Sequence, residues 1–286
     1  DSVLDALADA LKTAINSVYG LTSAHFTNPF KDERNVDNIV AKRGALFMIN
    51  LKHEVQDRGF TVAHIKTDSI KIPNATPEII QFVMDYGKQY GYTFEHEATY
   101  EKMCLVNDAV YIAKYASLEH CEELYGHEYL YSAPDVCKKN KKKPGKWDAT
   151  GAQFQQPYVF KKLFSKEPIV FEDMCETKSV QTALYLDMNE KLNEGEHDLY
   201  FVGRVGQFCP IMPGREGGEL LREGTDKNGN VKYSSATGAK GYRWLESEMV
   251  KILHKENDID ENYYRALVDA AKESIAQYGD IESFTE

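Results

Sequence analysis

The feature that most constrains the fold is a pair of short β-rich runs between residues 60 and 72. The first run contains Phe60, Val62 and Ile65, the second contains Ile70 and Ile72, and they flank a short polar tip at 66–69. This pattern is typical of two antiparallel strands joined by a tight turn. Because the runs are short and have helical patterns on both sides, we expect a hairpin within a mixed domain.

The flanking segments predict helices. Apolar residues recur at helical spacing over 2–18, and Gly20 follows as a helix-ending residue. A second helix is expected over about 36–57. After the hairpin, Thr76 and Pro77 are a favourable N-cap and first helical residue, so a third helix is expected to run to about Tyr90.

The rest of the chain is expected to divide near residue 116. Over 1–115, helices, the hairpin and three strand-like runs predict an α+β fold with helices packed on an antiparallel sheet. Residues 116–286 predict a mixed, largely helical region with a small β-hairpin. The expected elements are strands at 92–95, 102–106, 109–115 and 199–208, helices at 118–125, 155–164, 179–193 and 260–278, and a turn at 226–230.

Composition narrows the class of protein. The 286 residues suffice for a real core, and the longest apolar stretch is far too short to span a bilayer, so no membrane partner is expected. The five cysteines lack C-x-x-C spacing, which argues against structural zinc and favours a reducing, cytoplasmic setting. The net charge of −11 argues against wholesale coating of nucleic acid.

One segment is strongly basic, although the chain as a whole is acidic. Between Cys137 and Lys166 the chain carries nine lysines and a single acid, Asp148. Such a segment suits phosphate contacts, and it equally suits a solvated loop. Within it, Lys146 and Trp147 combine a cation with an aromatic ring, a mixture that suits nucleic-acid backbone contact and base stacking, so both are candidate DNA-binding residues.

Three polar residues of the first helix share one face. Lys12, Asn16 and Tyr19 are spaced i, i+4 and i+7, so their side chains project together. An amine can pair with a triphosphate, an amide can hydrogen-bond, and a phenol ring can pack under a base pair. Spacing alone also fits the wet side of an ordinary amphipathic helix.

The full string is more specific. Lys-x-x-x-Asn-Ser-x-Tyr-Gly, from Lys12 to Gly20, resembles motif B of family B DNA polymerases. The resemblance is to the phage and viral members of this family. It implies that residues 1–115 are the end of the fingers and the second half of the palm, and that residues 116–286 are thumb-like. It also implies that Lys12, Asn16 and Tyr19 bind an incoming dNTP.

The hairpin tip resembles motif C of the same family. Thr67-Asp68-Ser69 matches its Thr-Asp-Ser, so the resemblance implies that Asp68 is a catalytic, metal-binding residue in a site for two Mg²⁺ ions. Lys66 stands where the family has a first Asp, and we expect it to offset phosphate charge. Glu97 resembles an acid near the metals, and a surface acid is the equal alternative.

A primer-gripping stretch of the family falls near Tyr111. Tyr111 matches, but the family's Lys position is Ala109, and Lys114 would have to reach from another register. We carry Tyr111 and Lys114 as candidate DNA-binding residues.

The motif A string that supplies the second metal-binding Asp is absent from this sequence. The sequence therefore predicts part of a DNA-directed DNA polymerase acting on primer-template DNA by templated nucleotidyl transfer. It would need an N-terminal polymerase portion bearing motif A as its partner, and alone it would be inactive. The expected setting is the cytoplasm, that of a host cell if the source is viral. The alternative is a non-catalytic DNA-binding or processivity module with a palm-like fold, which Lys66 and Ala109 favour.

Overall fold

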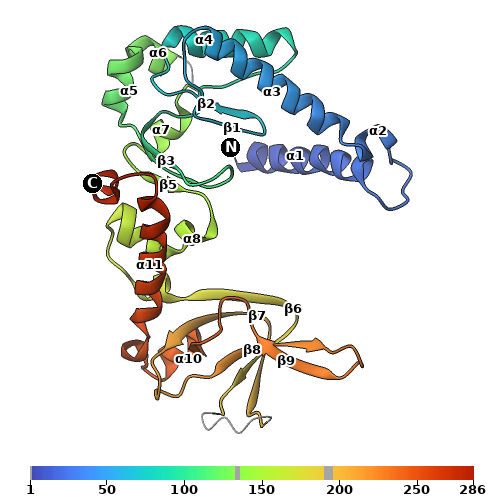
Figure 1. Cartoon of the computed structure of the whole chain (residues 1–286), viewed down its shortest axis with the longest axis vertical. Coiled ribbons are helices and arrows are strands. Elements are labelled where there is room, and N and C mark those ends of the chain that lie inside the picture. Colours follow the sequence, from blue (N-terminus) through green and yellow to red (C-terminus); the bar gives the residue numbers. More distant parts are fainter. Residues whose placement is uncertain (1, 133–135, 190–195) are drawn as a thin grey trace. The chain divides into compact units, whose positions relative to one another are not determined.

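A computed structural model describes residues 2–132, 136–189 and 196–286. The chain forms two compact units (Figure 1): unit 1 contains residues 1–99 and 118–141, and unit 2 contains residues 100–117 and 142–286. The chain therefore passes between the units at three places. The single boundary expected near residue 116 does not coincide with this division, because the strands just before it belong with the C-terminal part.

Unit 1 begins with three helices, and the first is longer than predicted. The expected end at Gly20 is wrong, since α1 continues to Ser23. The hydroxyls of Thr22 and Ser23 donate to the carbonyls of Val18 and Tyr19 at 2.8 and 2.7 Å, which satisfies the last turn without a glycine cap. The helices are α1 (Ser2–Ser23), α2 (Glu33–Val36) and α3 (Ile39–Asp57).

The hairpin and the helix after it form as predicted. Strands β1 (His64–Lys66) and β2 (Ser69–Lys71) pair antiparallel, and α4 (Pro77–Gln89) begins at the N-cap Thr76. The inner faces of α3 and α4 enclose one hydrophobic core, against which Ile65 and Ile70 of the hairpin pack. The buried members of this core are Met48, Leu51, Val55, Ile79, Ile80, Val83 and Tyr86.

The strand expected at 92–95 does not form. This segment follows α4 without a ladder partner, and Phe94 packs so closely on α4 that a Cβ at Gly87 would lie 2.6 Å from its ring. Unit 1 also contains α5 (Leu118–Tyr125), as expected, and α6 (His127–Ser132). The lysine-rich segment is ordered, since Lys138–Lys142 form α7 and the buried Asn140 bonds to the backbone N and O of Thr99.

Unit 2 contains a three-stranded antiparallel sheet in the order β3-β4-β5. Pro157 divides the helix expected over 155–164 into two short helices followed by one π-helical turn. The elements are β3 (Tyr100–Leu105), β4 (Tyr111–Tyr115), β5 (Trp147–Ala149), α8 (Ala152–Gln155), α9 (Pro157–Phe160) and the π turn Lys161–Ser165.

A five-stranded antiparallel sheet in the order β10-β7-β6-β8-β9 makes up most of the rest of unit 2. Helix α11 lies near it in sequence and packs on its core through Tyr263 and Tyr264. The elements are β6 (Glu176–Asp187), β7 (Leu199–Ile211), β8 (Glu219–Thr225), β9 (Val231–Ser235), β10 (Arg243–Glu246), α10 (Ser247–Ile252), α11 (Glu261–Ala276) and α12 (Ile281–Thr285).

The α+β class is confirmed, and the C-terminal part contains a five-stranded antiparallel sheet where only a small β-hairpin was expected. The helix expected over 179–193 is β6 as far as Asp187, and residues 190–193 lie outside the described part. β6 pairs with β7 on one side and with β8 on the other, and Leu184 and Leu186 alternate into the core. Pairing on both edges outweighs a weak local helical pattern.

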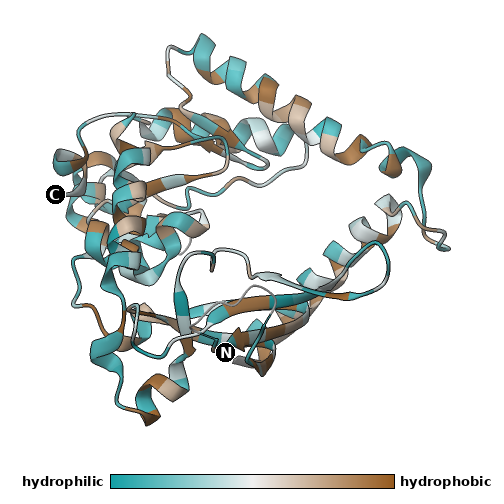
Figure 2. Cartoon of the chain, turned by 60° about the horizontal axis from the view of Figure 1, so that its bottom comes forward, coloured by the Kyte–Doolittle hydropathy of each residue, from teal (hydrophilic) through white to brown (hydrophobic). Residues whose placement is uncertain are grey.

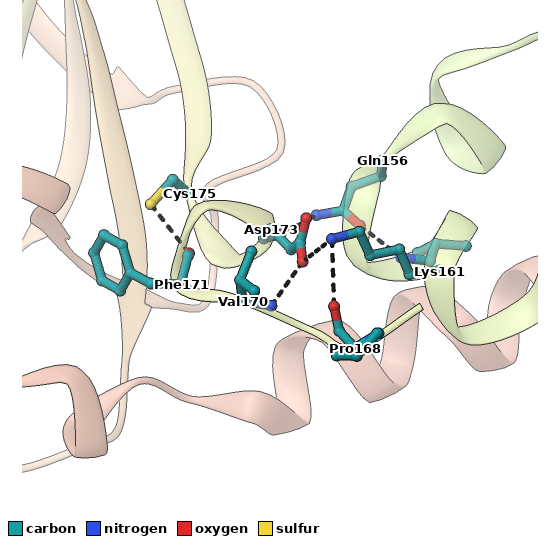
Figure 3. Close-up of polar contacts among 8 residues, drawn as sticks. Gln156, Lys161, Pro168, Val170, Phe171, Asp173 and Cys175 are labelled. Carbon is teal, nitrogen blue, oxygen red and sulfur yellow. Dashed lines mark hydrogen bonds and ion pairs between the residues drawn. The ribbon is translucent and has the colours of Figure 1, made fainter. Parts of the chain in front are cut away.

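A polar clasp joins the π turn to the segment before β6 (Figure 3). Lys161 Nζ lies 2.7 Å from Asp173 Oδ2, which also accepts the backbone N–H of Val170 at 2.8 Å. The same ammonium donates to the carbonyl of Pro168 at 3.3 Å. The Asp173 side chain is almost fully buried, so the clasp is a largely buried ion pair in which Asp173 Oδ2 accepts two hydrogen bonds.

Candidate functional site

The tip of the β1–β2 hairpin presents Asp68. Lys66 and Ser69 are the last paired residues, so Thr67 and Asp68 make a two-residue turn. Thr67 has φ 51°, a conformation that β-branched residues rarely adopt. Such strained positions are concentrated at functional sites, where the surrounding structure holds them.

The hairpin is held on the core of unit 1. Ile65 and Ile70, opposite each other in the register, pack on the α3–α4 core, and Ala63 N donates to Lys71 O at 2.9 Å. The hydroxyl of Ser69 donates to the carbonyl of Lys66 at 3.2 Å. These contacts explain how so short a hairpin can position a carboxylate, because two strands without a packed face are barely stable in water.

Charged residues from three segments surround this tip. Burial lowers the pKa of Lys71, and the Lys139 cation lowers it further, whereas the Glu97 and Asp68 carboxylates oppose the shift. Lys66 also contributes to the lowering. Asp68, Glu97, Lys66 and Lys139 therefore each lie within electrostatic range of Lys71.

Glu97 is held in this group by two contacts with α7. Its Oε1 lies 3.4 Å from Lys139 Nζ, and its backbone carbonyl accepts the N–H of Lys139 at 3.0 Å. Lys71 Nζ donates to Ser69 Oγ at 3.1 Å. Sequence reasoning missed Lys71 and Lys139 as members of the site. The lysine run was a signal for the second, but nothing in the local pattern links it to Glu97.

The donor set does not complete a Mg²⁺ site. Asp68 and Glu97 offer the carboxylate oxygens that Mg²⁺ prefers. Across residues 2–132, 136–189 and 196–286, however, no group of three His, Cys, Asp or Glu side chains is placed to hold a metal. Asp68 and Glu97 alone would therefore not hold two Mg²⁺ ions, and further oxygen ligands would be needed.

The three candidate nucleotide-binding residues lie together on α1. Lys12, Asn16 and Tyr19 are all exposed, and within the described part of the chain their side chains contact no other element through a hydrogen bond or ion pair. Gly20 has open space where a Cβ would stand. The face is therefore accessible to a ligand, and its arrangement relative to Asp68 is not set by a direct contact.

A different side of α1 is apolar and equally exposed. Its stripe recurs at helical spacing, roughly a third of a turn away from the polar trio. In Figure 2 the helix at the N-terminus includes brown, hydrophobic turns. The stripe consists of Val3, Leu4, Leu7, Leu11, Ile15 and Val18, each more than half exposed. An apolar stripe of this length marks a surface that normally packs against another one.

The candidate DNA-binding residues lie in the three-stranded sheet of unit 2. Lys114 and Trp147 are direct cross-strand partners, with Lys114 Nζ 5.9 Å from the indole centroid and 3.8 Å from Glu101 Oε1. Trp147 also packs on Phe164 and Phe284 at 5.3 Å each. The structure thus brings Lys114 and Trp147 together, and the indole has a core-packing role of its own.

The other two candidates flank this pair. Tyr111 begins β4, with its ring centroid 6.3 Å from that of Tyr100. Lys146 precedes β5, and its carbonyl accepts the N–H of Tyr115 at 2.9 Å. Tyr115 in turn donates its hydroxyl to Asp148 Oδ2 at 2.9 Å. All four candidates therefore sit on two paired strands or beside them.

Comparisons with known proteins add no neighbour. No protein-family model, curated protein or solved structure matches the chain. Among the helices of the described residues, none combines the length and apolar character needed to cross a membrane.

Proposed function

We propose that this chain is the part of a DNA-directed DNA polymerase that carries one metal-binding carboxylate and the nucleotide-facing helix. The observation that carries the proposal is Asp68 at a strained, core-anchored hairpin tip, where Lys71 interacts electrostatically with Asp68, with Glu97 and with two further lysines. Templated nucleotidyl transfer needs carboxylates to hold two metal ions and cations to meet the phosphates. This tip offers one such carboxylate and several such cations.

The remaining roles follow from side-chain chemistry. Lys12 would pair with the triphosphate of a dNTP, Asn16 would hydrogen-bond to it, and Tyr19 would pack against the nascent base pair. Lys71 and Lys139 would meet phosphate charge near Asp68. Tyr111, Lys114, Lys146 and Trp147 would contact the primer-template DNA. Five unbridged cysteines fit work in a reducing cytoplasm.

The proposal includes a second polypeptide portion. It would bring the motif A carboxylate to Asp68 and a complementary apolar surface to the stripe on α1. Two features support this: the donor set at the tip is incomplete, and the stripe has no covering surface among the described residues. One partner polypeptide, the polymerase portion that bears motif A, would supply both the missing carboxylate and an apolar groove for the stripe.

The experiment is primer extension with purified components. The chain would be assayed alone and mixed with a polypeptide bearing the motif A string, with Mg²⁺ and dNTPs. We expect extension only in the mixture, and a loss of about a hundredfold or more with Asp68→Ala, since a metal-binding carboxylate contributes several kcal/mol. Asp57→Ala, an exposed aspartate of the same unit, is the matched control and should extend normally. Strong extension by the chain alone, or by Asp68→Ala in the mixture, would contradict the proposal.

A second candidate is a DNA-binding module without catalysis. The observation that favours it is the excess of cations at the tip, where Lys66 stands in place of an acid and Lys71 and Lys139 lie near. It predicts binding of primer-template DNA that weakens steeply with salt. In that case Asp68→Ala would leave the affinity unchanged, the mixture would not extend primers, and Lys66→Ala with Lys139→Ala would flatten the salt dependence.

A further inference from the structure

Two cysteines face each other across the first strand pair of the large sheet. The β6–β7 ladder begins with the pair Glu176 and Phe208. Because the strands are antiparallel, the residue before Glu176 lies opposite the residue after Phe208. Cys175 therefore lies opposite Cys209. Their Sγ atoms are 3.7 Å apart. Figure 3 shows Cys175 beside the clasp, with its Sγ directed to the carbonyl of Phe171 at 3.4 Å.

We infer that Cys175 and Cys209 form an oxidisable dithiol, which a hydroperoxide converts into a disulfide that fastens the start of β6 to β7. Residues opposite each other on antiparallel strands have Cα atoms about 4.5–5.5 Å apart, within the range of about 4.4–6.8 Å that disulfides span. Closing the remaining gap between the sulfurs requires side-chain rotation and little backbone movement. The inference does not rest on the proposed polymerase function.

The two thiols differ in access. Cys209 is fully buried in the core of unit 2, between β6 and β10, whereas Cys175 is half-buried. An oxidant from solvent therefore meets Cys175 first, and Cys209 is placed to resolve the product. Cysteines that respond to oxidants are commonly accessible to solvent and placed next to a resolving cysteine, as here.

Charged neighbours tune the accessible thiol. Burial raises the pKa of Cys175, and the Glu172 carboxylate adds to the rise, whereas the Lys251 cation opposes it. Burial also raises the pKa of Cys209. Lys251 Nζ lies 3.1 Å from Glu172 Oε1 and 4.5 Å from the ring centroid of Phe171, and both charges act on the Cys175 thiol. Because the thiolate is the nucleophile, Lys251 promotes oxidation and Glu172 slows it.

The reaction balances in two steps. The Cys175 thiolate attacks one oxygen of hydrogen peroxide: an S–O bond forms, the O–O bond breaks, and the departing hydroxide takes up the thiol's proton as water. The Cys209 sulfur then attacks the sulfenic acid: the S–S bond forms, the S–O bond breaks, and the second water leaves with the Cys209 proton. Two thiols lose two electrons, and the peroxide is reduced to two waters.

The first experiment uses the unaltered full chain. After treatment with hydrogen peroxide and blocking of free thiols, digestion without reductant should yield the peptides of Cys175 and Cys209 joined, two hydrogen masses below their sum, and dithiothreitol should separate them. The oxidised form should unfold at higher temperature, because the crosslink joins positions 34 residues apart and limits the unfolded chain. Cys175 found as sulfinic acid, with Cys209 still a free thiol, would overturn the inference.

Variants at the half-buried Cys175 and at two exposed charged residues test the chemistry. Cys175→Ser should abolish the joined peptides, and Cys104→Ser, a control in another sheet, should leave them. Lys251→Met should slow crosslinking several-fold, Glu172→Gln should speed it, and Lys240→Met, at another exposed lysine, should not change it. Equal rates in the Lys251 and Glu172 variants would overturn the assignment of Cys175 as the attacking thiol.

Discussion

Helices α1 and α11 have similar amphipathic patterns and opposite fates. α11 buries Tyr263, Tyr264, Ala271 and Ile275, and these residues contribute to both hydrophobic cores of unit 2. α1 is longer, yet none of its described side chains is buried. An amphipathic pattern therefore indicates that one face of a helix packs against another surface. The pattern does not indicate whether that surface belongs to the same chain.

Ion pairs show a similar contrast between the units. In unit 2, Asp173 and Lys161 pair at 2.7 Å inside the protein, whereas in unit 1 Glu97 and Lys139 pair at 3.4 Å with both side chains more than a third exposed. The buried pair stabilises the fold. The exposed pair costs little to break, which leaves its members available to a ligand.

Breaking the buried pair should have the largest effect. Asp173→Ala leaves the Lys161 ammonium and the Val170 N–H without their acceptor, so we expect a loss of about 3–5 kcal/mol in the free energy of unfolding. Denaturant unfolding followed by tryptophan fluorescence is the measurement, because both tryptophans, Trp147 and Trp244, lie in unit 2. The double variant Asp173→Leu with Lys161→Met should recover most of the loss.

The exposed pair is the matched comparison. Glu97→Ala should cost at most about 1 kcal/mol. Hydrogen exchange of unit 1 would report this change, since that unit contains no tryptophan. A cost as large as that of Asp173→Ala would show that the Glu97 pair is structural, and the contrast between the units would fail.

The same substitution on the two helices should have unequal effects. Ile275 on α11 is 2% exposed and Ile15 on α1 is 69% exposed. Ile275→Ala should cost about 2–5 kcal/mol because it leaves a cavity. Ile15→Ala should change stability by less than about 0.5 kcal/mol. Equal protection of α1 and α11 from hydrogen exchange in the isolated chain would refute this difference.

Helix caps test whether the contrast extends beyond α1. Thr76 caps α4 in unit 1, where its hydroxyl accepts the N–H of Ile79, and Asp260 caps α11 in unit 2 by accepting the N–H of Asn262. Thr76→Ala and Asp260→Ala should each cost about 1 kcal/mol. Similar losses would confine the difference between the units to α1. No loss at Thr76 would instead indicate that all of unit 1 is loosely folded.

The smallest effect is a pH dependence in unit 2. Burial acts to raise the pKa of Asp187, but hydrogen bonds from His197 and from the N–H groups of Asp198 and Asn189 outweigh it, so the pKa is lowered from 3.8. A lowered carboxyl pKa stabilises the fold above its unfolded value, and this stability is lost as pH falls through the folded value. Asp187→Asn should therefore be less stable than the unaltered chain near neutral pH.

Unfolding midpoints across the acid range would measure this dependence. The two proteins should converge as the pH falls below the lowered folded pKa of Asp187, where the carboxyl is protonated in both states. His197→Gln keeps the two backbone hydrogen bonds to Asp187 and should show a weaker pH dependence. A constant difference between Asp187→Asn and the unaltered chain at all pH values would contradict the assignment.

Much of unit 1 could be predicted from local pattern. The hairpin, α3 and α4 formed within a few residues of the expected ranges, because their apolar spacing, caps and turn residues all agree. β6 could not be predicted, since its stability comes from pairing with β7 and β8, which lie at least 12 residues further along the chain. Local pattern also failed at Gly20, where side-chain hydroxyls replaced the glycine cap.

In the candidate site, too, some features could be predicted from local sequence pattern and others could not. The sequence by itself determined that Lys12, Asn16 and Tyr19 share a helix face and that Asp68 sits at a turn, because helical and strand periods are properties of the local backbone. Only the tertiary structure decided that Lys139 and Glu97 lie near Lys71 of the hairpin, since that depends on how α7 docks on the segment after α4. Tertiary structure also decided that the apolar side of α1 stays uncovered, because burial depends on surfaces supplied from elsewhere in space.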